Sequence, residues 1–276
     1  MWRSFAVGDS TVSVRTTSAA FGRWMDRALG PYRTSEAASP EHAYSVVIDG
    51  GQADGAGTGK RFHFLYQGVG VVARTLDLVT IARSLLSELQ AHALHRRVDG
   101  VYVHHGLVRS DDIGVLVPAW LVSYLSATGR RPAKIGITLP VSRWVRLDDA
   151  GRAIPGTPVL DIPGDALARL PRTPGHAREA VTSEDTGDAR TIHAIVTYRD
   201  DMDTLAGGGS AAALYHLASG CANLETLGGR AVNVLARVVE RAHCFQTGLG
   251  RPQQMLDALR AVFEHERAHA VVGARL

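Results

Sequence analysis

Apolar and polar positions alternate with different periods along the first third of the chain. Apolar residues recur at helical spacing over 75–95, and a shorter helical pattern over 19–29 ends at Gly30 and Pro31. Segments rich in β-branched and aromatic residues predict strands at 11–15, 44–48 and 62–66. We therefore expect residues 1–97 to form a strand-rich part with one long helix.

A hairpin is predicted where the central part begins. Residues 101–109 form a half-buried strand in this interpretation, Asp111 and Asp112 provide a turn, and 114–117 return as a second strand. A helical pattern follows over 118–125. Further strands are predicted at 135–139, 144–147 and 191–198.

The last third of the chain has helical periodicity. Three helices are predicted, one with Ser210 as its N-cap, one from 227 to about 243 and one from 252 to about 269. A long polar loop over 163–190 precedes them. The fold class is therefore α/β (α+β), with a mixed central sheet and flanking helices. The pattern divides the chain at 1–97 and 98–276, or makes it one continuous domain.

The end of the second hairpin strand lacks the residues of a phosphate-binding loop. Pro118 to Leu125 contain no glycine, whose backbone N–H would close on phosphate, and no lysine. The nearest alternative, Gly55 to Lys60, has three residues where the motif has four, and Arg61 follows the lysine. It also precedes a predicted strand, so we expect a flexible turn there.

Several motifs of the central part together resemble the HPr kinase/phosphorylase family and its shorter relatives found near peptide-modifying gene sets. They are His105-Gly106 before the hairpin, Gly114–Val117, the helical run to Leu125, Gly129-Arg130 and Leu147–Pro155. The resemblance implies an HPr-kinase-like core over 98–276. In the family a Gly-Lys-Ser/Thr loop follows the second strand, and a later aspartate pair binds metal and moves a proton. Neither is matched, because Asp148 and Asp149 stand where the relatives have a later turn.

The resemblance without its catalytic motifs implies a degenerate, non-catalytic relative, a pseudokinase without a cofactor. Such a protein would bind a protein or peptide as a partner or accessory subunit in bacterial peptide modification. One alternative is an atypical phosphotransferase that uses His105 and arginines. The other is a metal-dependent enzyme that uses His265, Glu266 and His269.

Five residues are candidates for ligand binding near the missing loop. Only one of the adjacent His104 and His105 can face a given cleft, and the resemblance selects His105, which in the relatives neighbours the transferred phosphate. Guanidinium groups suit carboxylates or phosphates. The candidate set is His105, Ser123, Arg130, Arg131 and Arg143, with Arg146 beside it. Packing and solvated charge are the alternative roles, and Trp120 and Tyr124, four residues apart, are expected in the core.

The most specific motif lies near the last residue of the chain. His265-Glu-Arg-Ala-His269 matches H-E-x-x-H, which puts two imidazoles on one helical face beside a glutamate that can serve as a general base. A third ligand would have to come from upstream, for instance from His243 or Glu240. The alternative is a solvated helix face with His and Arg near the negative end of the dipole.

Composition narrows the classes of partner. Thirty Lys and Arg against 27 Asp and Glu are nearly balanced, and the basic residues form no stripe, so we expect no nucleic-acid partner. No long apolar run predicts a membrane span or a secretion signal, and the two cysteines, Cys221 and Cys244, are expected as reduced thiols. The sequence thus predicts a cytoplasmic protein of unspecified oligomeric state.

Overall fold

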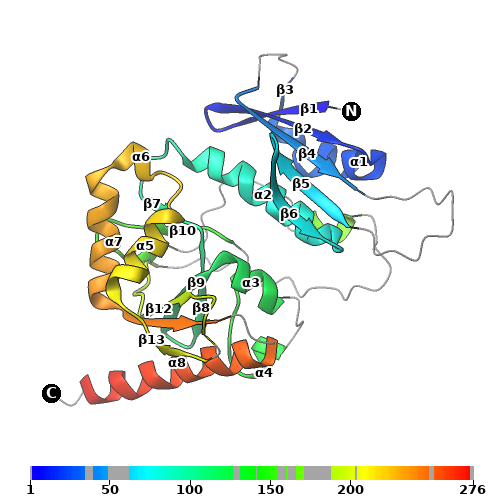
Figure 1. Cartoon of the computed structure of the whole chain (residues 1–276). Coiled ribbons are helices and arrows are strands. Elements are labelled where there is room, and N and C mark those ends of the chain that lie inside the picture. The colour runs from blue at the N-terminus through cyan, green and yellow to red at the C-terminus, as the bar shows by residue number, and fades with distance from the viewer. Residues whose placement is uncertain are drawn as a thin grey trace. The chain divides into compact units, whose positions relative to one another are not determined.

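A computed structural model gives the fold of the chain (Figure 1). It describes residues 2–34, 40–48, 62–126, 131–140, 142–154, 160, 166–170, 188–202, 204–248 and 252–273. The chain is a mixed α/β protein, which confirms the predicted fold class. It forms two compact units: unit 1 comprises Met1–Arg96 with Val159–Arg178, and unit 2 comprises Arg97–Pro158 with Glu179–Leu276. None of the helices in the described ranges is long and apolar enough to cross a membrane.

Unit 1 is built on a six-stranded mixed sheet in the order β3-β1-β2-β4-β5-β6. Its strands are β1 (Trp2–Val7), β2 (Ser10–Thr16), β3 (Arg33–Thr34), β4 (His42–Val47), β5 (His63–Gln67) and β6 (Gly70–Thr75). The predicted strands correspond to β2, β4 and β5, whereas β1, β3 and β6 were not predicted. The predicted turn over Gly55–Lys60 lies outside the described residues.

Two helices and a returning segment complete the core of unit 1. Helix α1 (Ala19–Ala28) begins after Ser18, whose hydroxyl accepts the Phe21 N–H, and a short 3₁₀ turn, η1 (Gly30–Tyr32), follows it. Helix α2 (Leu78–Leu94) begins after Asp77, whose carboxylate accepts the N–H groups of its first turn. Around η2 (Leu167–Arg169), the indole of Trp24 donates to the Ala166 carbonyl at 2.7 Å, which joins this segment to unit 1.

Unit 2 contains two sheets. A three-stranded antiparallel sheet has the order β11-β10-β7, and a five-stranded mixed sheet has the order β13-β14-β12-β9-β8. The strands are β7 (Val101–Val103), β8 (His105–Ser110), β9 (Ile113–Pro118), β10 (Val145–Leu147), β11 (Ala153–Ile154), β12 (Ala194–Tyr198), β13 (Ala206–Gly207) and β14 (His243–Thr247). The helices are α3 (Ala119–Ser126), α4 (Arg131–Lys134), α5 (Ser210–Ser219), α6 (Leu224–Leu227), α7 (Gly229–Arg241) and α8 (Pro252–Gly273).

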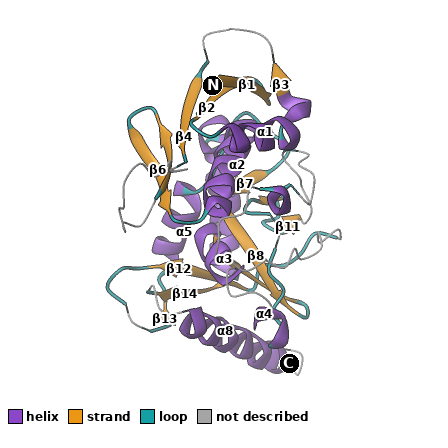
Figure 2. Ribbon diagram, turned by 90° about the vertical axis from the view of Figure 1, so that its right-hand side faces the viewer, coloured by secondary structure: helices purple, strands orange, loops and turns teal. Residues whose placement is uncertain are grey.

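The five-stranded sheet of unit 2 is covered by helices on both faces (Figures 1 and 2). Side chains alternate along its strands, so that Leu116 and Ile195 pack with α5 and α7. Val115, Val117 and Val196 face the other way and pack with α3 and α8. Strands β9, β12 and β14 are parallel, so their amino ends share one edge of the sheet and their carboxyl ends share the other. We call these the amino edge and the carboxyl edge.

Three local predictions in unit 2 were wrong. The strand predicted over 101–109 breaks at His104 into β7 and β8, which belong to different sheets and are almost fully buried. Residues 135–139 are a turn after α4, where Gly136 has φ 73°, and only Thr138 makes a bridge, to Arg109. Gly209, not Ser210, is the N-cap of α5. The helix predicted from 227 to about 243 is confirmed as α7 (Gly229–Arg241).

Candidate functional site

The carboxyl edge has no connection in which a phosphate loop would form. Strand β9 ends at Pro118 and α3 begins at Ala119, so no residue separates the strand from the helix. A phosphate loop supplies its N–H groups from several residues at this position. Helix α3 also lies directly on the hairpin, because a side chain at Gly106 would overlap Val122 and would come within 3.0 Å of Pro140.

Aromatic side chains cover the same edge. The rings of Trp120, in the first turn of α3, and Tyr198, the last residue of β12, meet edge to face with centroids 5.2 Å apart. Trp120 keeps 37% of its surface exposed, so the prediction that it is a core residue was wrong. Tyr124 is half-buried against the apolar cluster of α3 and α8. At the carboxyl edge, the first turn of α3 and the last residue of β12 therefore pack on each other.

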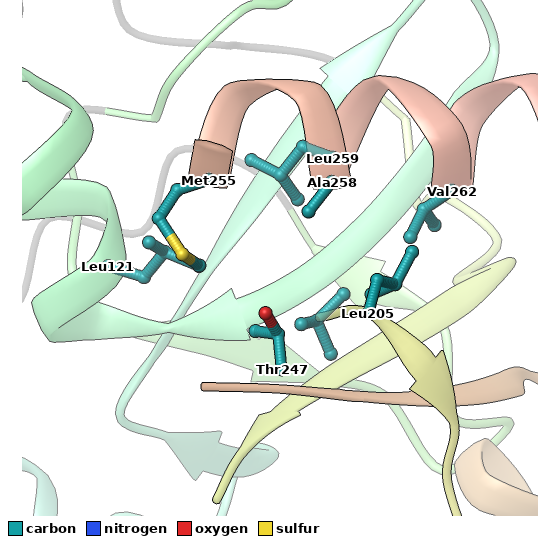
Figure 3. A pocket seen from close by; sticks show the side chains of 8 residues that line it. Leu121, Leu205, Thr247, Met255, Ala258, Leu259 and Val262 are labelled. Atoms are coloured by element: carbon teal, nitrogen blue, oxygen red, sulfur yellow. The ribbon is translucent and has the colours of Figure 1, made fainter. Parts of the chain in front are cut away.

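The space between α3, α8 and the sheet is apolar and small (Figure 3). Leu121, Val196, Met255 and Leu259 line it, with Thr247 at its polar side. It leaves no room even for a water molecule, whereas typical small-molecule sites have volumes of roughly 300–1,000 Å³. It would not hold a nucleotide.

His105 is beside this edge but is inaccessible. It pairs across the hairpin with Pro118, is 4% exposed, and neither ring nitrogen has a hydrogen-bond partner in the described part of the chain. Burial, with smaller effects of the nearby His104 and His216, lowers the pKa of His105 to about 3. A buried neutral imidazole offers no charge to an anion.

The remaining residues predicted to bind a ligand make other contacts or lie outside the described residues. The Ser123 hydroxyl donates to the Ala119 carbonyl of its own helix at 3.3 Å. Burial and the nearby charge of Arg143 lower the pKa of His104, which stacks on Trp144, to about 4. Arg146 pairs with Asp99 at 3.1 Å. Arg130 and the side chain of Arg131 lie outside the described residues.

Three histidines meet at the amino edge. His243 is the first residue of β14, and His265 and His269 lie one turn apart on α8, each with its ring exposed. One possible ligand atom from each of the three lies within 4.8 Å of the other two, and the ring centroids are 4.4–5.3 Å apart. Zn–N bonds of about 2.0–2.1 Å in tetrahedral geometry need nitrogens about 3.3 Å apart. Small rotations of exposed rings would produce that separation.

Glu266 is buried beside this cluster. Its carboxylate is 5% exposed, and the Nδ1–H of His243 donates to both of its oxygens at 2.8 and 3.0 Å. Glu266 continues the buried face of α8 that includes Leu259, Val262 and Phe263. Its position differs from that of a general base, because both oxygens contact a candidate ligand and are shielded from solvent.

The cluster offers three imidazoles to a metal ion and leaves a fourth position for water or another ligand. Imidazole suits zinc, copper and nickel, and three protein ligands leave a zinc ion one open position. The sequence paired His265 with His269 and named His243 only as one of two upstream candidates in a helix. Phe245 and Thr247, which favour strands, were the signal for β14.

Comparisons with known proteins add no relative to this picture. No family model, no curated protein and no solved structure matches the chain.

Proposed function

We propose that this chain is a non-catalytic, HPr-kinase-like protein that binds a protein or peptide and serves as a partner or accessory subunit in peptide modification. The observation that carries the proposal is the direct passage from β9 at Pro118 into α3 at Ala119. A nucleotide-dependent phosphotransferase needs backbone N–H groups at this point to hold phosphate.

The chemistry of the carboxyl edge supports a role without catalysis. Ligands of open α/β sheets bind outside the carboxyl ends of the strands. Here the Trp120–Tyr198 pair occupies that region, the space between α3, α8 and the sheet has no room for a ligand, and His105 is buried and neutral. The alternative of a phosphotransferase that acts through His105 has less support for these reasons.

An exposed edge strand in unit 1 supports peptide binding. Among the described residues, β6 is the last strand of its sheet, and Val71 and Val72 are 57% and 37% exposed on it. Val69, in the turn before it, is fully exposed. A peptide can add to such an edge through backbone hydrogen bonds, with alternate side chains resting on the valines.

The thiols fit the proposed place of action in the cytoplasm. Cys221 and Cys244 are free, and burial raises the pKa of each thiol. Raised pKa values keep thiols protonated and unreactive, which suits a reducing compartment.

Thermal unfolding of the full chain with ATP and magnesium tests the loss of nucleotide handling. A ligand at 100 times its Kd would stabilise the protein by about 2.7 kcal/mol. We expect no shift of Tm over a millimolar range of ATP, in parallel with an ATP-binding control protein. A saturable shift would contradict the proposal.

Affinity capture from cells of the native host tests partner binding. We expect the wild-type chain to retain a peptide or a peptide-modifying protein, and Val71→Lys to lose it because charge blocks the apolar edge. Val232→Lys, at an exposed valine of α7, is the matched control and should retain the partner. Equal capture by both variants would show that the partner does not bind at β6. If the wild-type chain captures no specific partner, partner binding itself is contradicted.

A further inference from the structure

We propose that His243, His265 and His269 bind one Zn²⁺ ion that fastens the last turns of α8 to the start of β14, and that Glu266 is a positioning residue for the His243 ring. This inference is independent of the proposed function, because it concerns the amino edge and not the carboxyl edge of the sheet.

The backbone already brings the three rings together. The first two ligands come from one helix face, because residues four apart are neighbours on a helix surface. The rings of His265 and His269 have centroids 4.4 Å apart, and the His243 ring lies 5.3 and 5.0 Å from them. Since all three are exposed, an ion reaches them without any opening of the core.

The buried carboxylate provides a second, separate observation. Position 266 lies where the apolar face of α8 would continue, so a glutamate there loses hydration that only a specific partner can replace. That partner is the Nδ1–H of His243. A carboxylate that accepts from Nδ1–H fixes the tautomer of the imidazole. The second ring nitrogen, Nε2, is then free to bind a metal. Glu266 therefore prepares His243 for a metal that Glu266 does not touch.

The location favours a structural role over hydrolysis. The first half of α8 is held by apolar side chains, from Met255 to Phe263. Beyond Phe263 the described contacts are mostly polar: Glu266 contacts His243, and Arg267 contacts Ser110, the last residue of β8, and Asp111 of the following turn. The His265 ring also lies against Phe245 of β14. An ion shared by β14 and α8 would secure this half of the helix. Three imidazoles favour zinc over magnesium or calcium, which prefer oxygen ligands.

Zinc titration of the chelator-treated full chain tests the site. We expect one equivalent to bind, and Tm to rise by about 5–10 °C at 100 times the Kd. His265→Ala and His269→Ala should each abolish the shift, whereas Arg260→Ala, an exposed change on the same helix, should keep it. Magnesium should produce no shift. A wild-type chain that binds no zinc, or histidine variants that bind it as the wild type does, would overturn the proposal.

A pair of identical substitutions on α8 tests the role of Glu266. Glu266→Gln should bind zinc 10–100-fold more weakly, as changes to groups behind metal ligands do, and Glu264→Gln, two residues away and exposed, should be unchanged. Circular dichroism without metal checks that both variants fold. Cobalt bound to the wild type should show the visible absorption of a tetrahedral ion, and this spectrum should change only in Glu266→Gln. Equal affinities and spectra in the two variants would remove the positioning role.

Discussion

The two edges of the parallel strands in unit 2 differ in what their side chains do. At the carboxyl edge, Trp120 packs on Tyr198 and α3 follows β9 without a loop. At the amino edge, exposed histidines of β14 and α8 surround a buried glutamate. The edge at which α/β sheets ordinarily bind ligands is thus filled, and the opposite edge carries the polar chemistry.

This difference shows that the layered sheet and a ligand site at its carboxyl edge depend on different residues. The layers of the sheet need only apolar side chains that alternate between faces, and these are present along β9 and β12. The N–H groups of a phosphate loop come from a few consecutive residues between a strand and a helix. A strand that passes directly into its helix provides none of these groups, and the layers of the sheet still form. The following predictions change one edge at a time, from the largest expected effect to the smallest.

Gly106→Ala tests how closely α3 is packed at the carboxyl edge. The added methyl group would overlap Val122 and meet Pro140, so we expect the free energy of unfolding to fall by about 1–3 kcal/mol. Gly207→Ala is the control, because no atom of the residues that the structure describes lies within 4 Å of its added methyl group. Urea unfolding followed by circular dichroism measures both. Equal stabilities would mean that α3 is loosely held and that room exists at this edge.

His105→Leu tests whether the buried imidazole takes up a proton. Its pKa is lowered to about 3, so between about pH 6.5 and 3 the unfolded chain binds a proton that the folded chain does not. The free energy of unfolding should therefore decrease as the pH is lowered from about 6.5 to 3, by up to about 1.4 kcal/mol per pH unit for each such histidine. His104 and His92, with pKa values near 4, act in the same direction.

The leucine variant should lose the share of that slope that belongs to His105. It should remain folded at pH 7, since it replaces a buried ring to which the described part of the chain offers no hydrogen bond. Urea unfolding at pH 7 and pH 5 gives the slopes. An unchanged slope would show that His105 is protonated in the folded protein, and it would again be a candidate for anion binding.

Local patterns predicted those elements whose apolar periodicity is complete within one segment. Helix α2 follows from its leucine stripe, and the β8–β9 hairpin follows from two apolar strands around Asp111, which has φ 55° in the turn. The lack of phosphate-loop residues over 118–125 could be seen in the sequence for the same reason, since such a loop depends on residue types at consecutive positions.

Elements formed by distant partners were not predictable in this way. Strand β14 consists of His-Cys-Phe-Gln-Thr, in which only Phe245 and Thr247 favour a strand and apolar and polar residues do not clearly alternate. It is a strand because it pairs in parallel with β12. Without β14, His243 was assigned to a helix end, and its meeting with His265 and Glu266 could not be foreseen. The prediction for 135–139 failed in the opposite sense, because Ile137 and Leu139 pack in the core while only Thr138 pairs with a strand, at Arg109 of β8.

Trp120→Ala tests whether the aromatic cover alone keeps nucleotide out. Loss of the edge-to-face contact with Tyr198 should lower the free energy of unfolding by about 0.5–1.5 kcal/mol. We expect no gain of ATP binding, because the N–H groups of a loop are still missing. Thermal unfolding with and without ATP and magnesium measures both effects. A new shift with ATP would show that the side chain, and not the backbone, excludes the ligand.

Arg267→Ala is the mildest change and tests the polar contacts of the amino edge. Arg267 contacts the Ser110 hydroxyl at 2.6 Å and Asp111 at 3.1 Å, but it is 45% exposed and Asp111 is 80% exposed. Exposed ion pairs contribute about 0.2–1 kcal/mol, so we expect a loss in that range, smaller at high salt. Urea unfolding at two salt concentrations measures it. A loss well above this range, independent of salt, would show that the last turns of α8 are held mainly by this arginine, and zinc would then have little left to secure.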